Sequence, residues 1–124
     1  MRIPVIVALA LALANAASAE TELRCGWLDN PTPANWWLVD ADGEWTISIQ
    51  GQGEFSNFFD VAPTGPYERE GLHPSYGWSC ACIEGVFDPE TRRLTQTLAV
   101  RNLPLSQCRE DPALPDRAPV TPED

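Results

Sequence analysis

Hydrophobic and polar residues alternate along four or five segments of the chain, and no segment repeats apolar residues at a helical spacing. The clearest pair of such segments is 35–39 and 44–50, separated by a turn rich in Asp and Gly. This arrangement predicts a β-hairpin. In its second strand the inward residues are predicted to be Trp45, Ile47 and Ile49, and the outward ones Thr46, Ser48 and Gln50.

Residues 76–87 form the longest predicted strand, which turns at 88–91 and returns over 92–100. At a period of two, this strand places Tyr76, Trp78, Cys80 and Cys82 on one face and smaller residues on the other. On the return strand the residues expected to be buried are Leu94, Leu98 and Val100. The predicted fold is therefore all-β, a small antiparallel sheet or an open barrel.

The segments outside these hairpins are predicted to be irregular. Residues 62–75 contain three prolines and read as a long loop, a feature that is often functional or mobile. A single helical turn is expected over 105–109, after Pro104. Residues 115–124 are rich in proline and acidic residues, so a disordered tail is predicted after one domain spanning 20–114.

The first 19 residues have the pattern of a signal peptide. Arg2 is followed by an apolar run over 3–14 and by Ala17-Ser18-Ala19, so cleavage is expected before Glu20. The apolar run is too short to span a bilayer. The mature protein is therefore predicted to be periplasmic or extracellular, without membrane insertion.

Four cysteines in a short exported chain indicate two disulfides. Cys80 and Cys82 are the least suitable pair, because residues i and i+2 of one strand lie too far apart for an unstrained bridge. Cys25 and Cys108 are therefore each expected to join one member of this pair, and either connectivity remains open. Both bridges would then attach the ends of the domain to its longest strand.

The charge of the chain excludes some classes of partner. All 18 acidic residues and seven of the eight basic ones follow residue 19, which gives the mature form a net charge of −11. A surface this acidic repels nucleic acid and anionic lipid, so neither is an expected partner. It keeps a secreted protein soluble and also favours a basic partner protein.

Several strings of the mature chain resemble a family of small exported bacterial proteins, the domain-of-unknown-function family 4087. The resemblance extends from Arg24 to about Leu114, with Trp78 at a position where tyrosine or phenylalanine is expected. It implies export and a framework of four cysteines, and it carries over no catalytic residue. The matching strings are Arg24-Cys25-Gly26-Trp27, Asn30-Pro31-Thr32-Pro33, Asp42-Gly43-Glu44-Trp45, Tyr76-Gly77-Trp78-Ser79-Cys80-Ala81-Cys82, Pro104-Leu105-Ser106-Gln107-Cys108-Arg109 and Asp111-Pro112-Ala113-Leu114.

No motif predicts a catalytic residue, a metal site or a cofactor. Cys80-Ala81-Cys82 lies in a strand and not at a helix N-terminus, which favours structural disulfides over a redox dithiol or a zinc site. The acidic residues of 40–44 suit a hairpin turn better than a calcium loop. His73 is the sole histidine, so a hydrolase using histidine would need it with Ser75 or Ser79, and neither serine lies in a nucleophile elbow.

The five tryptophans are the most suggestive feature. Trp36 and Trp37 must point to opposite faces of a strand, so one of them is available to stack on a sugar or anchor a protein. The leading hypothesis is a binding module without enzymatic activity, an inhibitor or accessory protein of another envelope protein. A module binding glycan or peptidoglycan is the alternative, and a small hydrolase comes third. The candidate binding residues are Trp36, Trp37, Tyr67, His73 and Tyr76.

Overall fold

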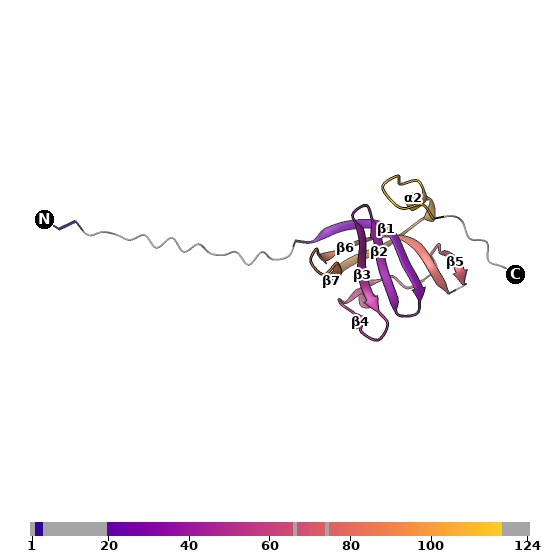
Figure 1. Cartoon of the computed structure of the whole chain (residues 1–124), viewed down its shortest axis with the longest axis horizontal. Helices are drawn as coiled ribbons and strands as arrows, with labels where there is room; N and C mark the ends of the chain where they lie inside the picture. Colours follow the sequence, from indigo (N-terminus) through magenta and orange to yellow (C-terminus); the bar gives the residue numbers. More distant parts are fainter. Residues whose placement is uncertain (1, 4–19, 66, 74, 118–124) are drawn as a thin grey trace.

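The computed structural model describes residues 2–3, 20–65, 67–73 and 75–117, most of which form β-strands (Figure 1). The predicted signal peptide, apart from residues 2–3, lies outside the described residues. In chain order the elements are β1 (Glu22–Thr32), β2 (Asn35–Asp40), β3 (Gly43–Ile49), β4 (Gly53–Glu54), α1 (Phe58–Val61), β5 (Glu70–His73), β6 (Tyr76–Asp88), β7 (Arg93–Leu103) and α2 (Leu105–Arg109).

The strands form a small barrel of the Greek-key type. The sheet runs in the order β1-β2-β3-β7-β6-β5, and β1 also pairs with β6. The four strands β6-β1-β2-β3 are all antiparallel, and a long connection joins β3 to β6. β3 and β7 pair in parallel, through Thr46 and Arg93, so the sheet is mixed. The result is a partly open five-stranded barrel, an architecture that OB-folds share.

The barrel interior contains the main hydrophobic core. Its buried residues come from all five of the barrel's strands and from α1, whose Phe58 is 1% exposed. Trp36, Ala62 and Val100 pack against this cluster from its margin. The buried members are Leu28, Leu38, Trp45, Ile47, Phe58, Ala81, Ile83, Phe87 and Leu94.

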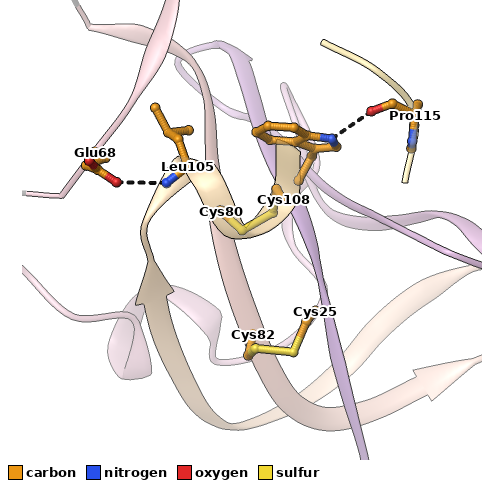
Figure 2. The surroundings of a disulfide bond; sticks show 8 residues. Cys25, Glu68, Cys80, Cys82, Leu105, Cys108 and Pro115 are labelled. Atoms are coloured by element: carbon orange, nitrogen blue, oxygen red, sulfur yellow. Dashed lines mark hydrogen bonds between the residues drawn. A yellow bond between two sulfur atoms is a disulfide. The ribbon is translucent and has the colours of Figure 1, made fainter. Parts of the chain in front are cut away.

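A second cluster lies on the outer face of β1 and β6, under the C-terminal segment. Trp27, Cys80, Cys108 and Leu114 are its buried members. Disulfides join Cys25 to Cys82 and Cys80 to Cys108, so each end of the domain is bonded to β6 as predicted (Figure 2). Because the second bond ties α2 to β6, the chain that follows α2 is held over the outer face of the sheet (Figure 1).

β-Bulges in β3 and β7 change which residues point inward, so part of the predicted alternation is wrong. Where β2 pairs with β3, Trp36 lies opposite Ser48 and Trp37 opposite Thr46, which leaves Ile47 as an extra residue in β3. Ser48 is therefore buried, at 2% exposed, although an outward position was expected. β7 has two extra residues: Thr95, between the pairs of Leu94 and Gln96, and Leu98, between the pairs of Thr97 and Ala99. Leu98 is 46% exposed and Thr97 2%, the reverse of the prediction, because a bulge shifts the alternation by one residue.

The middle of the chain is more ordered than the sequence indicates. Asn57, just before α1, binds the backbone of Thr97 with both side-chain groups: Nδ2 donates to the Thr97 carbonyl and Oδ1 accepts from its N–H. These bonds satisfy backbone groups beside the bulge at Leu98. The predicted irregular stretch 62–75 contains β5, which extends the sheet beside the start of β6.

The structure also bears on the environment of the protein. Two disulfides indicate a non-cytoplasmic environment, where thiols are not kept reduced. None of the helices in the described ranges has the length and apolar character needed to cross a bilayer.

Candidate functional site

The five predicted binding residues divide between two hollows. Trp37, His73 and Tyr76 line one of them, which we call the Asp29 pocket. Trp36 and Tyr67 line the other, which we call the Trp36 groove. Trp36 and Trp37 are consecutive in β2, so their side chains leave the strand on opposite sides.

The register of three neighbouring strands builds the Asp29 pocket. Asp29 of β1 pairs with Trp37 of β2 on one side and with Trp78 of β6 on the other. Residues directly opposite each other in a sheet project from the same face, so a carboxylate lies between two indole rings. β5 lies on the other side of β6, where Glu70 pairs with Trp78 and His73 pairs with Tyr76.

The pocket has a volume of about 310 Å³, and half of its lining residues are aromatic. At Gly77, one of the lining residues, the backbones of β5 and β6 approach closely. Its φ is +152°, and a Cβ there would lie 2.0 Å from the Glu70 carbonyl oxygen. Only glycine fits this approach between β5 and β6. The lining residues are Asp29, Pro31, Trp37, His73, Tyr76, Gly77, Trp78 and Arg117.

Asp29 is the electrostatic centre of the pocket. Its Oδ2 accepts a hydrogen bond from Trp37 Nε1 at 2.9 Å and an ion-paired one from Arg117 Nη2 at 2.7 Å. The residue is only 7% exposed. Burial raises the pKa of Asp29 to about 6, against the opposing effects of the Arg117 charge and the Trp37 hydrogen bond. The carboxylate is therefore only partly compensated by its neighbours.

Unpaired polar atoms concentrate in this pocket. Among the described residues, four buried side-chain polar atoms have no hydrogen-bond partner, and three of them belong to pocket residues: Asp29 Oδ1, Trp78 Nε1 and Arg117 Nε. Buried polar groups are normally paired, and a cluster of exceptions needs a specific explanation. This concentration of unpaired groups makes the pocket the candidate functional site.

Sequence reasoning missed Asp29, Trp78 and Arg117 as pocket residues. Asp29 lies outside the predicted hairpins, yet β1 continues to Thr32, and the spacing Cys25, Trp27, Asp29 places it on the cysteine face. No sequence pattern marks Arg117, because it lies in the predicted disordered tail. Of that tail the structure describes 115–117, and Trp27 Nε1 donates to the Pro115 carbonyl at 2.9 Å (Figure 2).

The residues of the hydrolase hypothesis are not brought together. His73 is exposed, its ring lies 5.1 Å from that of Tyr76, and its Nδ1 accepts from the backbone N–H of Ser75 at 3.0 Å. Ser79 is buried at 3% exposed and alternates with Trp78, so it faces the barrel side of β6. In the described part of the chain, no cluster of three or more Cys, His, Asp or Glu residues has a geometry suited to a metal ion.

The Trp36 groove is smaller, about 180 Å³, and is also rich in aromatic rings. The Trp36 ring packs 6.0 Å from Phe58 and 5.7 Å from Phe59, and Phe59 is 46% exposed. Tyr67 lines the groove on the loop side, beside Thr64. The Trp36 groove is therefore lined in part by residues of the hydrophobic core, whereas the Asp29 pocket contains an ion pair.

Comparison with known protein families identifies the chain. The family model of proteins of unknown function, DUF4087, matches residues 19–115. The chain belongs to the DUF4087 family. The DUF4087 match includes every residue lining the Asp29 pocket except Arg117, which lies two positions beyond it. No curated protein and no solved structure matches the chain.

Proposed function

We propose that this DUF4087 protein is an exported binding module that takes a cationic side chain of a basic partner protein into the Asp29 pocket. The observation that carries the proposal is the position of the chain's own Arg117. Its guanidinium pairs with Asp29, and its Cζ lies 5.5 Å from the centre of the Trp78 ring and 5.8 Å from that of Trp27. These distances are within the range of cation–π attraction.

The pocket has the chemistry that a cationic group requires. Aromatic faces attract a guanidinium or ammonium, and a buried carboxylate adds charge in a region from which water is largely excluded. Asp29 Oδ1 is buried without a partner, so a donor that took the place of Arg117 would find an unused acceptor there. Arginine suits the site better than lysine, since its planar fork can bind both carboxylate oxygens and stack on indole rings.

The overall charge supports a basic partner at longer range. The mature chain carries 18 acidic residues and seven arginines. An acidic field of this size accelerates association with a basic protein and weakens as salt increases. An envelope protein is the proposed partner, because the leader pattern and the disulfides together favour the periplasm or the extracellular space.

Glycan binding is the second candidate function, and the Trp36 groove favours it. Trp36, Phe59 and Tyr67 offer rings on which a sugar can stack, while Asn102 and Thr64 provide polar groups at the rim. This function would leave the Asp29 pocket unused. The two candidates are therefore separable by substitutions at adjacent positions of β2.

The test is a titration of the oxidised mature chain with blocked Gly-Arg-Gly, Gly-Lys-Gly and Gly-citrulline-Gly peptides, followed by tryptophan fluorescence and calorimetry. We expect saturable binding of the arginine peptide, weaker binding of the lysine peptide and none of the uncharged citrulline peptide. Added salt should weaken the interaction, because the attraction is electrostatic.

Trp36→Ala and Trp37→Ala form the matched pair for this test. Trp37→Ala and Asp29→Asn should each lose binding of the arginine peptide, whereas Trp36→Ala should retain it. Equal binding of the arginine and citrulline peptides, or equal loss in the two tryptophan variants, would contradict the proposal. A glycan that binds wild type and Trp37→Ala but not Trp36→Ala would favour the second function.

A further inference from the structure

Residues 115–117, which we call the strap, cross the outer face beyond the last buried residue of the domain. Up to that point the chain is firmly held: Cys108 is bonded to Cys80, and Leu114 is 8% exposed, with its N–H donating to the Asp111 carbonyl at 3.2 Å. The strap itself belongs to no helix or strand. The hydrogen bonds that hold it are Trp27 Nε1 to the Pro115 carbonyl and Arg117 to Asp29.

The strap places the Arg117 guanidinium in the pocket, but this group makes only one of the hydrogen bonds that it could form with Asp29. Arg117 reaches Asp29 with one nitrogen, Nη2, and contacts one oxygen, Oδ2. Arg117 Nε and Asp29 Oδ1 are both buried without a partner. A guanidinium normally binds a carboxylate through two parallel hydrogen bonds, and that arrangement is the stronger one. The tether at Leu114 therefore holds Arg117 in a weaker arrangement than a free arginine side chain can adopt.

We propose that the strap is a tethered competitor, in which Arg117 occupies the Asp29 pocket until a cationic side chain of the partner displaces it. This inference rests on the proposed function, since it requires the pocket to accept such a group. The short tether gives Arg117 a high effective concentration, so displacement needs a ligand with better contacts. Lifting residues 115–117 disturbs neither disulfide, and the buried cluster keeps Trp27, Cys80, Cys108 and Leu114.

The competitor model has a direct consequence for affinity. When a ligand must displace the strap, its apparent affinity is its intrinsic affinity multiplied by the fraction of molecules in which the pocket is open. Removing the Arg117 side chain should therefore strengthen the binding of the arginine peptide, by about tenfold if the contact contributes about 1.4 kcal/mol. A purely structural role for Arg117 predicts the opposite change, because losing a supporting residue weakens a site.

The experiment compares wild type with Arg117→Ala and with Asp116→Ala as a control at the neighbouring exposed position. NMR of the indole N–H groups of Trp27 and Trp37 reports the strap contact without any ligand, and calorimetry with Gly-Arg-Gly reports affinity. We expect both indole signals to shift in the Arg117 variant and its affinity to rise about tenfold. The Asp116 variant should resemble wild type in both measurements.

The outcomes separate this inference from the proposed function. If the Arg117 variant shows the indole shifts but binds the peptide equally or more weakly, the competitor model is wrong while the binding function stands. If neither protein binds the peptide, the proposed function fails and the competitor model fails with it. Arg117→Lys covers the case in which the alanine variant is unstable: it retains a cation on the strap and should bind the peptide with an affinity between those of wild type and the alanine variant.

Discussion

The two faces of the sheet are stabilised in different ways. The inner face carries a hydrophobic cluster of nine buried side chains, none of them a cysteine. The cluster on the outer face has four buried members, two of them cysteines, and the open end of that face holds an ion pair and three unpaired polar atoms. Hydrophobic burial therefore stabilises the barrel, whereas covalent bonds and charges hold the layer on its outside, where a binding pocket can exist without weakening the core.

The largest effect is expected from the inner face. Phe58→Ala should lower the free energy of unfolding by about 3–5 kcal/mol, because it leaves a cavity against the core. Phe58 is 1% exposed, whereas its neighbour Phe59 is 46% exposed. Phe59→Ala is therefore the matched control and should lower the free energy of unfolding far less. Urea unfolding of the two variants measures both values. Equal costs would contradict the assignment of α1 as the element that closes the core.

The disulfide between Cys80 and Cys108 provides the next largest effect, on the outer face. Replacing both cysteines with serine should cost about 3 kcal/mol, since the bond closes a chain segment of 28 residues. The loss should be local: the indole signal of Trp27 should move, because the segment carrying Pro115 is released, while the core signal of Trp45 stays in place. Simultaneous movement of both signals would show that the two faces unfold as one unit.

The pH dependence of stability tests the charged end of the outer face. The folded-state pKa of Asp29 is about 6, above its ordinary value of 3.8, so the folded protein binds this proton more readily than the unfolded chain does. The contribution of Asp29 to stability is therefore fully present below about pH 4 and falls by roughly 2–3 kcal/mol as pH rises to about 6.

Asp29→Asn isolates this contribution from those of the other carboxylates. The difference in unfolding free energy between wild type and the variant should change across pH 4 to 6 and level off above that range, because asparagine does not titrate. Denaturant unfolding at several pH values measures the difference. A constant difference across the range would show that Asp29 is not desolvated as the structure indicates.

The smallest effect on stability is expected at Leu98, in a bulge of β7. Leu98→Thr should change stability by no more than about 0.5 kcal/mol, since Leu98 is 46% exposed. Thr97→Ala should cost more, because it removes the hydroxyl contact with Ser56 Oγ at 2.9 Å from a buried position. Thermal unfolding of both variants distinguishes this order from the reverse one, which strict alternation would predict.

Much of the fold was predictable because its signals are local. The hairpin at Gly43 and the long strand from Tyr76 follow from alternation and turn residues, and the structure confirms both. The errors at Ser48 and Leu98 arise from bulges, where one extra residue reverses the inward side. Strand β5 was missed because its order depends on pairing with β6 and not on its own composition.

The candidate site was predictable only in part. Trp37 was identified as one of the tryptophan pair, and His73 and Tyr76 lie in or beside the predicted long loop; the structure brings these three together. Trp36 and Tyr67 were grouped with them but lie in a separate groove. The carboxylate at the centre, Asp29, was overlooked, because a single acidic residue in an acidic chain carries no signal of burial.

The sequence alone determined the all-β class, the four-cysteine framework, the acidic character and the family, because each depends on residue types and short-range spacing. Only the tertiary structure decided which cysteines pair, which face of the sheet each tryptophan occupies and that Arg117 meets Asp29 across 88 positions of the chain. Those features depend on strand register and barrel closure, which are set by the burial of the whole hydrophobic core and not by any segment in isolation.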